Sequence, residues 1–183
     1  DVLGSRGLGD VYKRQLLDDE TTPVLWRGPI IAGTVKQFYS DIIWGDIDYM
    51  FIDCPPGTGD VPLTIFQSIP IDGVVVVTTP QDLVSVIVGK AVHMADSMNI
   101  PVIGMIENMS YFICPDCNNK HYIFGKSQLE QVIRDLYIGH AIRLPINPSL
   151  AGLMDRGEIE HMEANADLQE FADLISTFDP DKY

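Results

Sequence analysis

Residues 53–60, with the sequence DCPPGTGD, combine a carboxylate with a glycine-rich turn that could bind a magnesium phosphate. They follow an apolar run at residues 48–52 and precede a helix-like segment. A carboxylate at the carboxyl end of a strand, followed by such a turn, is typical of nucleotide-binding α/β proteins. Asp53 could hold Mg²⁺ through water, and the backbone at Gly57 and Gly59 could approach phosphate oxygens. An ordinary strand-to-helix turn would use the same residue types.

The second candidate site is the pair Cys114 and Cys117, spaced as C-x-x-C. Two thiolates this close can bind one soft metal, but they do not complete a tetrahedral site. Zinc could bind if His121 and a fourth ligand joined the pair. A thioredoxin-like redox pair is disfavoured, because it would lie at a helix N-terminus after the first strand of a different fold. Cys54 is expected to be a small core residue and not a ligand.

Apolar runs and helical periodicities alternate along the chain, which predicts a mostly parallel sheet with crossover helices in a single domain. Asn108 is expected to close a strand at the same sheet edge as Asp53, and Asp60 is a candidate N-cap. On the long helix, Ile87 and Val88 are among the residues expected to face the core. We predict strands at residues 48–53, 73–79, 102–108, 121–124 and 141–145, and helices at residues 28–43, 60–68, 82–99, 127–136, 149–156 and 164–178.

Composition is that of an ordinary globular domain, since 46% of the 183 residues are hydrophobic and 21% are charged. The net charge of −14 argues against a surface for nucleic acid or anionic membrane. No apolar stretch approaches the length that spans a membrane. Three cysteines, two of them in a C-x-x-C pair, indicate a reducing compartment, so we expect a cytoplasmic protein.

Five short segments occur in an order that is similar to one known family. They are WRGP at residues 26–29, WGDIDY at 44–49, DCPPGTGD at 53–60, IENMSYF at 106–112 and CPDC at 114–117. From about Thr22 to about Ala172, the chain resembles the Mrp/ApbC family of P-loop ATPases, which are cytosolic iron–sulfur cluster carriers related to MinD/ParA. The resemblance implies a three-layer α/β fold and ATP-dependent transfer of clusters to recipient apoproteins.

The resemblance also implies roles for particular residues. Cys114 and Cys117 from each subunit of a homodimer would hold a shared [4Fe–4S] cluster. An Asn at the position of Asn108 would contact the adenine of ATP, and the loop containing Pro145 and Ile146 would line the other side. The residues implied to sense Mg²⁺ and the terminal phosphate, and so to serve ATP hydrolysis, are Asp53, Gly57, Thr58 and Gly59. For Asn108, a turn cap is an equally good interpretation from the sequence alone.

One family motif is missing. The sequence contains no Gly-x-x-x-x-Gly-Lys-Ser/Thr, and in the nearest string, residues 125–127, Lys120 stands where the first glycine would be. We therefore interpret residues 125–127 as a loop or helix start. We expect a P-loop fold that lacks its first strand and P-loop, and a chain that binds ATP poorly without them. We expect residues 1–21 to be a non-native or disordered leader, residues 22–178 the C-terminal part of the ATPase domain, and residues 179–183 a tail.

A regulatory ATPase of the MinD/ParA kind, without a cluster, is the alternative function. Such proteins usually need a membrane-binding helix or a basic surface for DNA. The acidic balance of this chain and its polar C-terminal residues 179–183 offer neither.

Overall fold

The computed structural model describes residues 28–162 and 165–182. The predicted leader at residues 1–21 and the start of the WRGP segment lie outside these ranges. The chain divides into two compact units. The first contains the described residues up to Ile69 together with Ser149–Met162, and the second contains Pro70–Pro148 together with the described residues after 164.

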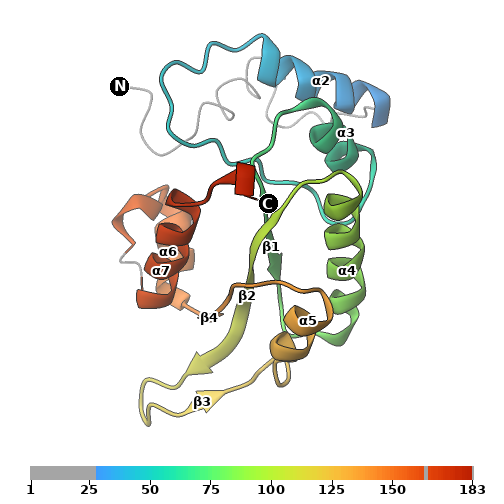
Figure 1. Ribbon diagram of the computed structural model, residues 1–183. Helices are drawn as coiled ribbons and strands as arrows, with labels where there is room; N and C mark the ends of the chain where they lie inside the picture. The colour runs from blue at the N-terminus through green and yellow to red at the C-terminus, as the bar shows by residue number, and fades with distance from the viewer. Residues whose placement is uncertain (1–27, 163–164, 183) are drawn as a thin grey trace. The chain divides into compact units, whose positions relative to one another are not determined.

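The second unit is built on four strands, which are β1 (Val74–Thr78), β2 (Val102–Ile113), β3 (Lys120–His121) and β4 (Ala141–Pro145). β2 lies between β1 and β4, and both neighbours run parallel to it (Figure 1). β3 pairs antiparallel with the far end of β2. β1 is a run of four valines and a threonine, side chains that suit a buried parallel strand. The predicted mostly parallel α/β sheet is thus confirmed.

Helices cover both faces of this sheet: α4 (Asp82–Ser97), α5 (Leu129–Asp135) and α7 (Ala166–Ser176). On one face, Met105 of β2 is packed in a core that includes Val88 of α4 and Leu129 of α5. On the other face, Gly104 lies against Phe171 of α7, and an added Cβ would come within 2.7 Å of the ring. Successive strand residues point to opposite faces. The second unit therefore has three layers, with α4 and α5 on one side and α7 on the other (Figure 1).

The first unit contains α2 (Gly28–Ser40), α3 (Asp60–Ser68), most of α6 (Pro148–Arg156) and the short 3₁₀ helix η1 (Ile159–His161). α2 and α3 contact each other, and Ile65 of α3 is buried. A further 3₁₀ turn, η2 (Pro180–Lys182), lies in the predicted tail. Within the described ranges, no helix has both the length and the apolar character that a bilayer crossing would require.

The predicted strand at residues 48–53 is wrong. This segment is extended but forms no strand ladder. Its apolar side chains are exposed, and Phe51 exposes 75% of its surface to solvent. A strand needs a partner for its backbone N–H and C=O groups, and among the described residues none pairs with this run. Asp53 therefore does not end a strand. Asp60 is also not an N-cap, because it is the first residue of α3 and Gly59 occupies the cap.

The prediction that β2 ends at Asn108 is also wrong, since the strand continues to Ile113. Its register to β4 shifts between Glu107 and Tyr111, and Met109 has a positive φ of 55° within this irregular stretch. The irregularity interrupts the ladder without ending the strand. β3 covers only Lys120–His121, so the predicted strand at residues 121–124 is shorter and begins one residue earlier. The remaining helices and strands are confirmed, with ends within three residues of the prediction.

Candidate metal centre

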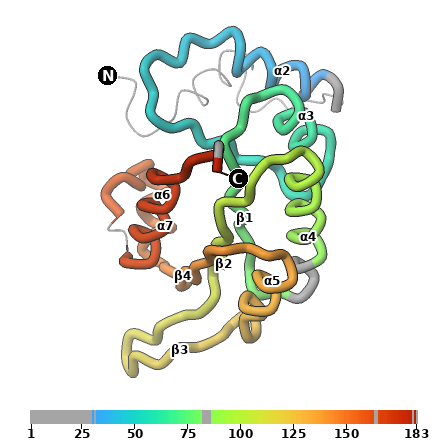
Figure 2. Tube along the Cα trace, in the orientation of Figure 1, coloured from blue at the N-terminus to red at the C-terminus, as the bar shows by residue number. Residues whose placement is uncertain are grey.

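Cys114 and Cys117 lie in the turn that joins β2 to β3, a hairpin that extends away from the other elements of its unit (Figure 2). The backbone N–H of Cys114 donates to the carbonyl of Asn119 at 3.0 Å. The N–H of Asn118 donates back to the carbonyl of Cys114 at 2.9 Å, with Asn118 at a φ of 56° that Asn tolerates. The turn is therefore closed by hydrogen bonds on both sides, which fixes the backbone that carries the two thiols.

Both cysteines are free thiols; Cys114 is half-buried and Cys117 is exposed. Their Sγ atoms and one imidazole nitrogen of His121 all lie within 4.8 Å of one another. Hydrogen bonds from the backbone N–H of Cys117 and then of Asp116 lower the pKa of the Cys114 thiol, and the Cys117 side chain adds to this effect. The thiolate is the form that binds metals, so the turn favours the ligand state of Cys114.

The hairpin also places aromatic and basic side chains beside the thiols. The Nζ atom of Lys120 lies 4.2 Å from the centre of the Tyr111 ring, a cation–π contact across the two strands. Tyr122, which follows His121, is 49% exposed. The hairpin thus presents an accessible surface with soft ligands at its turn.

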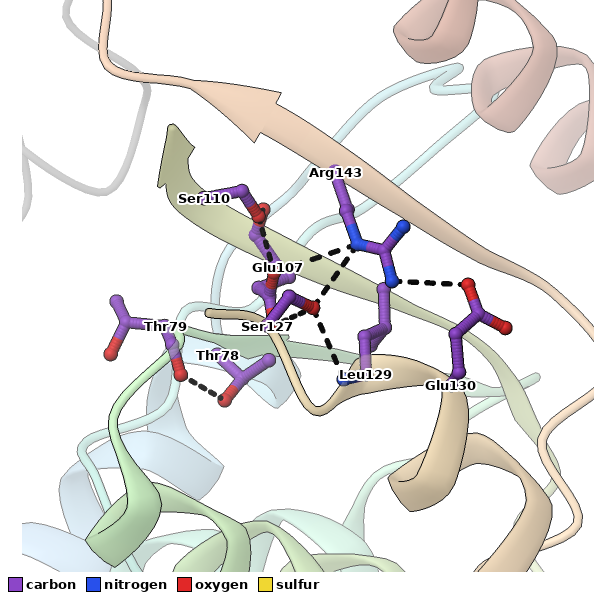
Figure 3. Close-up of polar contacts among 8 residues, drawn as sticks. All are labelled: Thr78, Thr79, Glu107, Ser110, Ser127, Leu129, Glu130 and Arg143. Carbon is purple, nitrogen blue, oxygen red and sulfur yellow. Dashed lines mark hydrogen bonds and ion pairs between the residues drawn. The ribbon is translucent and has the colours of Figure 1, made fainter. Parts of the chain in front are cut away.

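At the root of the hairpin, a buried carboxylate joins three segments of the chain (Figure 3). Glu107 of β2 is only 3% exposed, and its carboxylate accepts hydrogen bonds from the hydroxyls of Ser110 and, at 3.0 Å, Ser127. The Nε of Arg143 donates to the Ser127 hydroxyl at 3.1 Å and lies 3.8 Å from the Glu107 carboxylate. The guanidinium also reaches Glu130 at 3.0 Å. A buried charge of this kind is stable only when it is paired and hydrogen-bonded, as here.

Sequence reasoning did not identify Glu107 as part of a site. The signal was present, because a single carboxylate stands in an otherwise mostly apolar strand, IGMIEN, and a buried acid requires a cation. Its partners Ser127 and Arg143 are 20 and 36 positions away along the chain, and only the β2–β4 pairing and the return of the chain after the hairpin bring them close.

The Gly125-Lys126-Ser127 string is a loop ahead of α5, as interpreted from the sequence. The Ser127 hydroxyl donates to Glu107 and accepts from Arg143 and from the N–H of Leu129. A hydroxyl has one proton and two lone pairs, so this set uses its whole capacity. The Ser127 hydroxyl therefore connects groups of the protein and has no capacity left for a phosphate.

A pocket opens at the carboxyl end of β1, beside the middle of β2, with about 340 Å³ of space including its open mouth. This edge of a parallel sheet is where α/β proteins place their ligands. The pocket lies wholly within the second unit. Its lining residues are Thr78, Thr79, Pro80, Gln81, Val88, Met105, Glu107, Gln128, Leu129 and Val132.

Asn108 follows Glu107 at this edge and is half-buried. Its Oδ1 accepts from the N–H of the adjacent Met109 at 2.9 Å. The N–H of Ile146 donates to the carbonyl of Tyr111 at 2.7 Å, and Pro145 pairs with Tyr111 across the strands. Asn108 therefore lies within β2, while Pro145 and Ile146 lie at the end of the neighbouring β4 in the same unit. Contact of any of them with a base remains a prediction.

The turn at residues 53–60 belongs to the first unit. Asp53 and Thr58 are exposed, and Gly57 has a φ of 89° that favours glycine. A Cβ placed on Gly57 or Gly59 would meet nothing within 4 Å, so the backbone there is open to approach. Cys54 is half-buried, and this burial, followed by the charge of Asp53, raises the pKa of its thiol.

Residues 7–178 match the family model described as ParA: NUBPL iron-transfer P-loop NTPase. The chain is 48% identical over 157 residues to an iron-sulfur cluster carrier protein of Methanocaldococcus jannaschii, covering 85% of this chain and 54% of the relative. It is 40% identical over 178 residues to an iron-sulfur cluster carrier protein of Methanococcus maripaludis, an alignment that covers 96% of this chain and 61% of the relative. The chain thus spans a little more than half the length of these curated relatives.

A solved structure from Archaeoglobus fulgidus is similar in fold, with a TM-score of 0.68 and 38% identity, covering 82% of this chain and 58% of that one. It is described as a nucleotide-binding protein in complex with ADP, with cobalt found by PIXE. The parallel sheet covered by helices, the hairpin with its cysteine pair and the match over nearly all of its length lead to one conclusion: this chain belongs to the NUBPL iron-transfer P-loop NTPase family of the ParA group.

Proposed function

We propose that this chain binds an iron–sulfur cluster through Cys114 and Cys117 and passes the cluster to recipient apoproteins. The observation that carries the proposal is the pair of free, accessible thiols on a hydrogen-bonded turn, with the pKa of Cys114 lowered. Two relatives that cover most of the chain are described as iron-sulfur cluster carrier proteins, which supports it. A regulatory ATPase without a cluster would leave the thiol pair without a role.

Two thiolates supply half of the four ligands that a [4Fe–4S] cluster takes. A second copy of the chain would supply the other two, so we propose a homodimer with the cluster bridging the two hairpins. The projecting position of the hairpin suits this arrangement, because a ligand turn at the end of two strands can meet its twin (Figure 2). Free thiols also suit the reducing cytoplasm.

The nucleotide part of the proposal uses the turn in the first unit. Asp53 is exposed, and the space around Gly57 and Gly59 is open, so the turn fits an approaching magnesium phosphate. Thr58 would add a hydroxyl there. The family is described as P-loop NTPases, so ATP is the proposed nucleotide. The solved neighbour is described as a complex with ADP, which supports an adenine nucleotide.

Taken by itself, the second unit offers a separate candidate contact, because we propose that Asn108, Pro145 and Ile146 contact an adenine base. Asn108 lies within β2, Pro145 is the last residue of the neighbouring β4, and Ile146 follows it. The carboxyl ends of parallel strands are where α/β proteins bind ligands. β2 itself runs on from Asn108 to the hairpin, and Cys114 follows its last residue. Asn108 and Cys114 are six residues apart, and six residues of extended chain span at most about 20 Å. The candidate base contact and the cysteine pair are therefore connected through β2.

Anaerobic reconstitution with iron and sulfide tests the cluster site. We expect thiolate-to-iron absorbance in the visible range, about two irons per subunit because two subunits share four, and a dimer on size-exclusion chromatography. The variants Cys114→Ser and Cys117→Ser should lose the absorbance, whereas Cys54→Ser, which changes the thiol of the other unit, should keep it. Equal iron and sulfide in the Cys114→Ser/Cys117→Ser double variant would refute the assignment.

A further inference from the structure

We propose that Cys114, Cys117 and His121 of one subunit form a three-ligand site for a single divalent transition-metal ion, with the fourth position open. The three ligand atoms already lie within 4.8 Å of one another. This inference extends the proposed function by giving the same hairpin a mononuclear state that needs no second copy. It concerns the loading of metal onto one hairpin, and it assigns His121 a role that cluster binding by the cysteines does not require.

The separation of the ligand atoms suits one small ion. Metal–sulfur bonds of about 2.3 Å and metal–nitrogen bonds of about 2.0 Å place tetrahedral ligand atoms ~3.5–3.8 Å apart. The present upper limit of 4.8 Å is therefore only about 1 Å wider than a closed site. Cys117 and His121 are exposed, so side-chain rotation can supply this contraction without moving packed groups.

The backbone holds the three residues together before any metal arrives. His121 is paired with Phe112 across the antiparallel strands, which places its Cα at a fixed point of the hairpin. The N–H of Cys114 donates to the carbonyl of Asn119, the residue just before β3, which closes the turn. The turn holds both cysteines and β3 holds His121, so the backbone of the ligands is already in place and metal binding has to order only their side chains.

The donor set determines which ions would bind. Two thiolates and a neutral imidazole balance the charge of a divalent ion, and soft sulfur with imidazole suits Fe²⁺, Co²⁺ and Zn²⁺. Among the residues that the structure describes, no further Cys, His, Asp or Glu joins this group. An open fourth position is the arrangement of metal sites that exchange a ligand, whereas closed four-ligand sites serve structure.

One consequence is competition between metals. Zinc binds a given nitrogen and sulfur site more tightly than ferrous iron. A hairpin that has taken up zinc would therefore be unable to offer its two thiols to an iron–sulfur cluster. We expect one equivalent of Zn²⁺ per subunit to block reconstitution with iron and sulfide, and His121→Ala to weaken that block.

Anaerobic titration of the reduced, metal-free chain with Co²⁺ tests the site. We expect one Co²⁺ per subunit in a monomer by analytical ultracentrifugation, with thiolate-to-cobalt charge-transfer bands and the visible bands of a four-coordinate ion. His121→Ala should weaken Co²⁺ binding at least about tenfold and shift the visible bands. His140→Ala, which changes an exposed histidine outside the group, should leave both unchanged.

A rescue variant separates a ligand role from a folding role. His121→Cys keeps a soft ligand at the same position, so it should retain Co²⁺ with stronger charge-transfer absorbance from a third sulfur. Half an equivalent of Co²⁺ per subunit in a dimer would overturn the proposal, and so would unchanged affinity and spectrum in His121→Ala. If Co²⁺ binds as described but iron and sulfide never form a cluster, the proposed carrier function is wrong and the mononuclear site is supported. If a cluster forms but Co²⁺ does not bind with His121 as a ligand, the carrier function is supported and the mononuclear site is wrong.

Discussion

Single side chains in the second unit act as junctions between distant segments. Ser127 donates to Glu107 and accepts from Arg143, and in this way it ties the loop after the hairpin to β2 and β4. Within the described part of the chain, no buried side-chain nitrogen or oxygen lacks a partner. Because Glu107 is charged and almost fully buried, each hydrogen bond to it offsets part of a large desolvation cost.

Removing the Ser127 hydroxyl should therefore be costly. We expect Ser127→Ala to lower the free energy of unfolding by roughly 1–3 kcal/mol, because one oxygen of the buried Glu107 would lose its donor. The matched control is Glu130→Gln, which weakens a solvent-exposed ion pair with Arg143 and should cost less than about 1 kcal/mol. Urea denaturation of both variants gives the comparison, and equal losses would contradict the importance of the buried network.

The cysteines should differ in reactivity in the metal-free protein. The pKa of Cys114 is lowered by hydrogen bonds in its turn, whereas burial and the charge of Asp53 raise the pKa of Cys54. As pH rises, the Cys114 thiolate therefore forms first and the Cys54 thiolate only at higher pH, and the thiolate is the nucleophile. Iodoacetamide at neutral pH, followed by peptide mass spectrometry, should modify Cys114 before Cys54. Preferred labelling of Cys54 would show that this order is wrong.

At the scale of helices and strands, the sequence predicted well wherever burial follows from a local pattern. The run of valines in β1 and the apolar residues of β4 lie in the parallel sheet as predicted. For α4 the expected core face is confirmed in part, since Val88 is buried as predicted, together with Val92 and Ala95, whereas Ile87 is 47% exposed. Periodicity defines a helix, but the neighbouring element selects which apolar stripe is covered.

Strand pairing is what the sequence could not supply. Residues 48–53 have the composition of a strand but remain unpaired, and β2 continues past Asn108 because β3 and β4 pair with its second half. The cysteine pair could be predicted, because its spacing alone brings two thiols into one turn. The Glu107 network could not, because Ser127 and Arg143 reach it only through tertiary structure.

The contact between β2 and α7 can be tested at one glycine. We expect Gly104→Ala to destabilise the protein by roughly 1–3 kcal/mol, because its Cβ would stand 2.7 Å from the Phe171 ring and 2.9 Å from the carbonyl oxygen of His140. Gly139→Ala is the control, since a Cβ there meets nothing within 4 Å. Thermal denaturation should show a lower midpoint for Gly104→Ala alone, and an unchanged midpoint would mean that this packing is looser than described.

At the scale of the whole molecule, the chain combines a hairpin that carries two free cysteines and His121 with an incomplete set of nucleotide motifs. The thiols, the bulged β2 strand and the carboxyl ends of β1 and β4 all lie in the second unit. The sequence has no Gly-x-x-x-x-Gly-Lys-Ser/Thr. Its net charge of −14 also opposes close approach of a polyanion such as ATP unless cations screen it.

Isothermal titration of this chain with MgATP should accordingly show only weak binding. The glycine-rich loop and its lysine normally cradle the β- and γ-phosphates, and no segment of this sequence provides them. A relative that carries the motif serves as the positive control under the same conditions. Low-micromolar binding by this chain would show that other residues supply the phosphate contacts.

Cluster transfer tests the central claim most directly. The reconstituted chain is mixed anaerobically with an apo form of a [4Fe–4S] enzyme, in the presence of a chelator that captures free iron, and recovery of enzyme activity is followed. The account predicts that activity returns despite the chelator, and that the Cys114→Ser/Cys117→Ser double variant treated identically restores none. Loss of all activation when the chelator is present, or equal activation by the double variant, would contradict a carrier that holds its cluster on this hairpin.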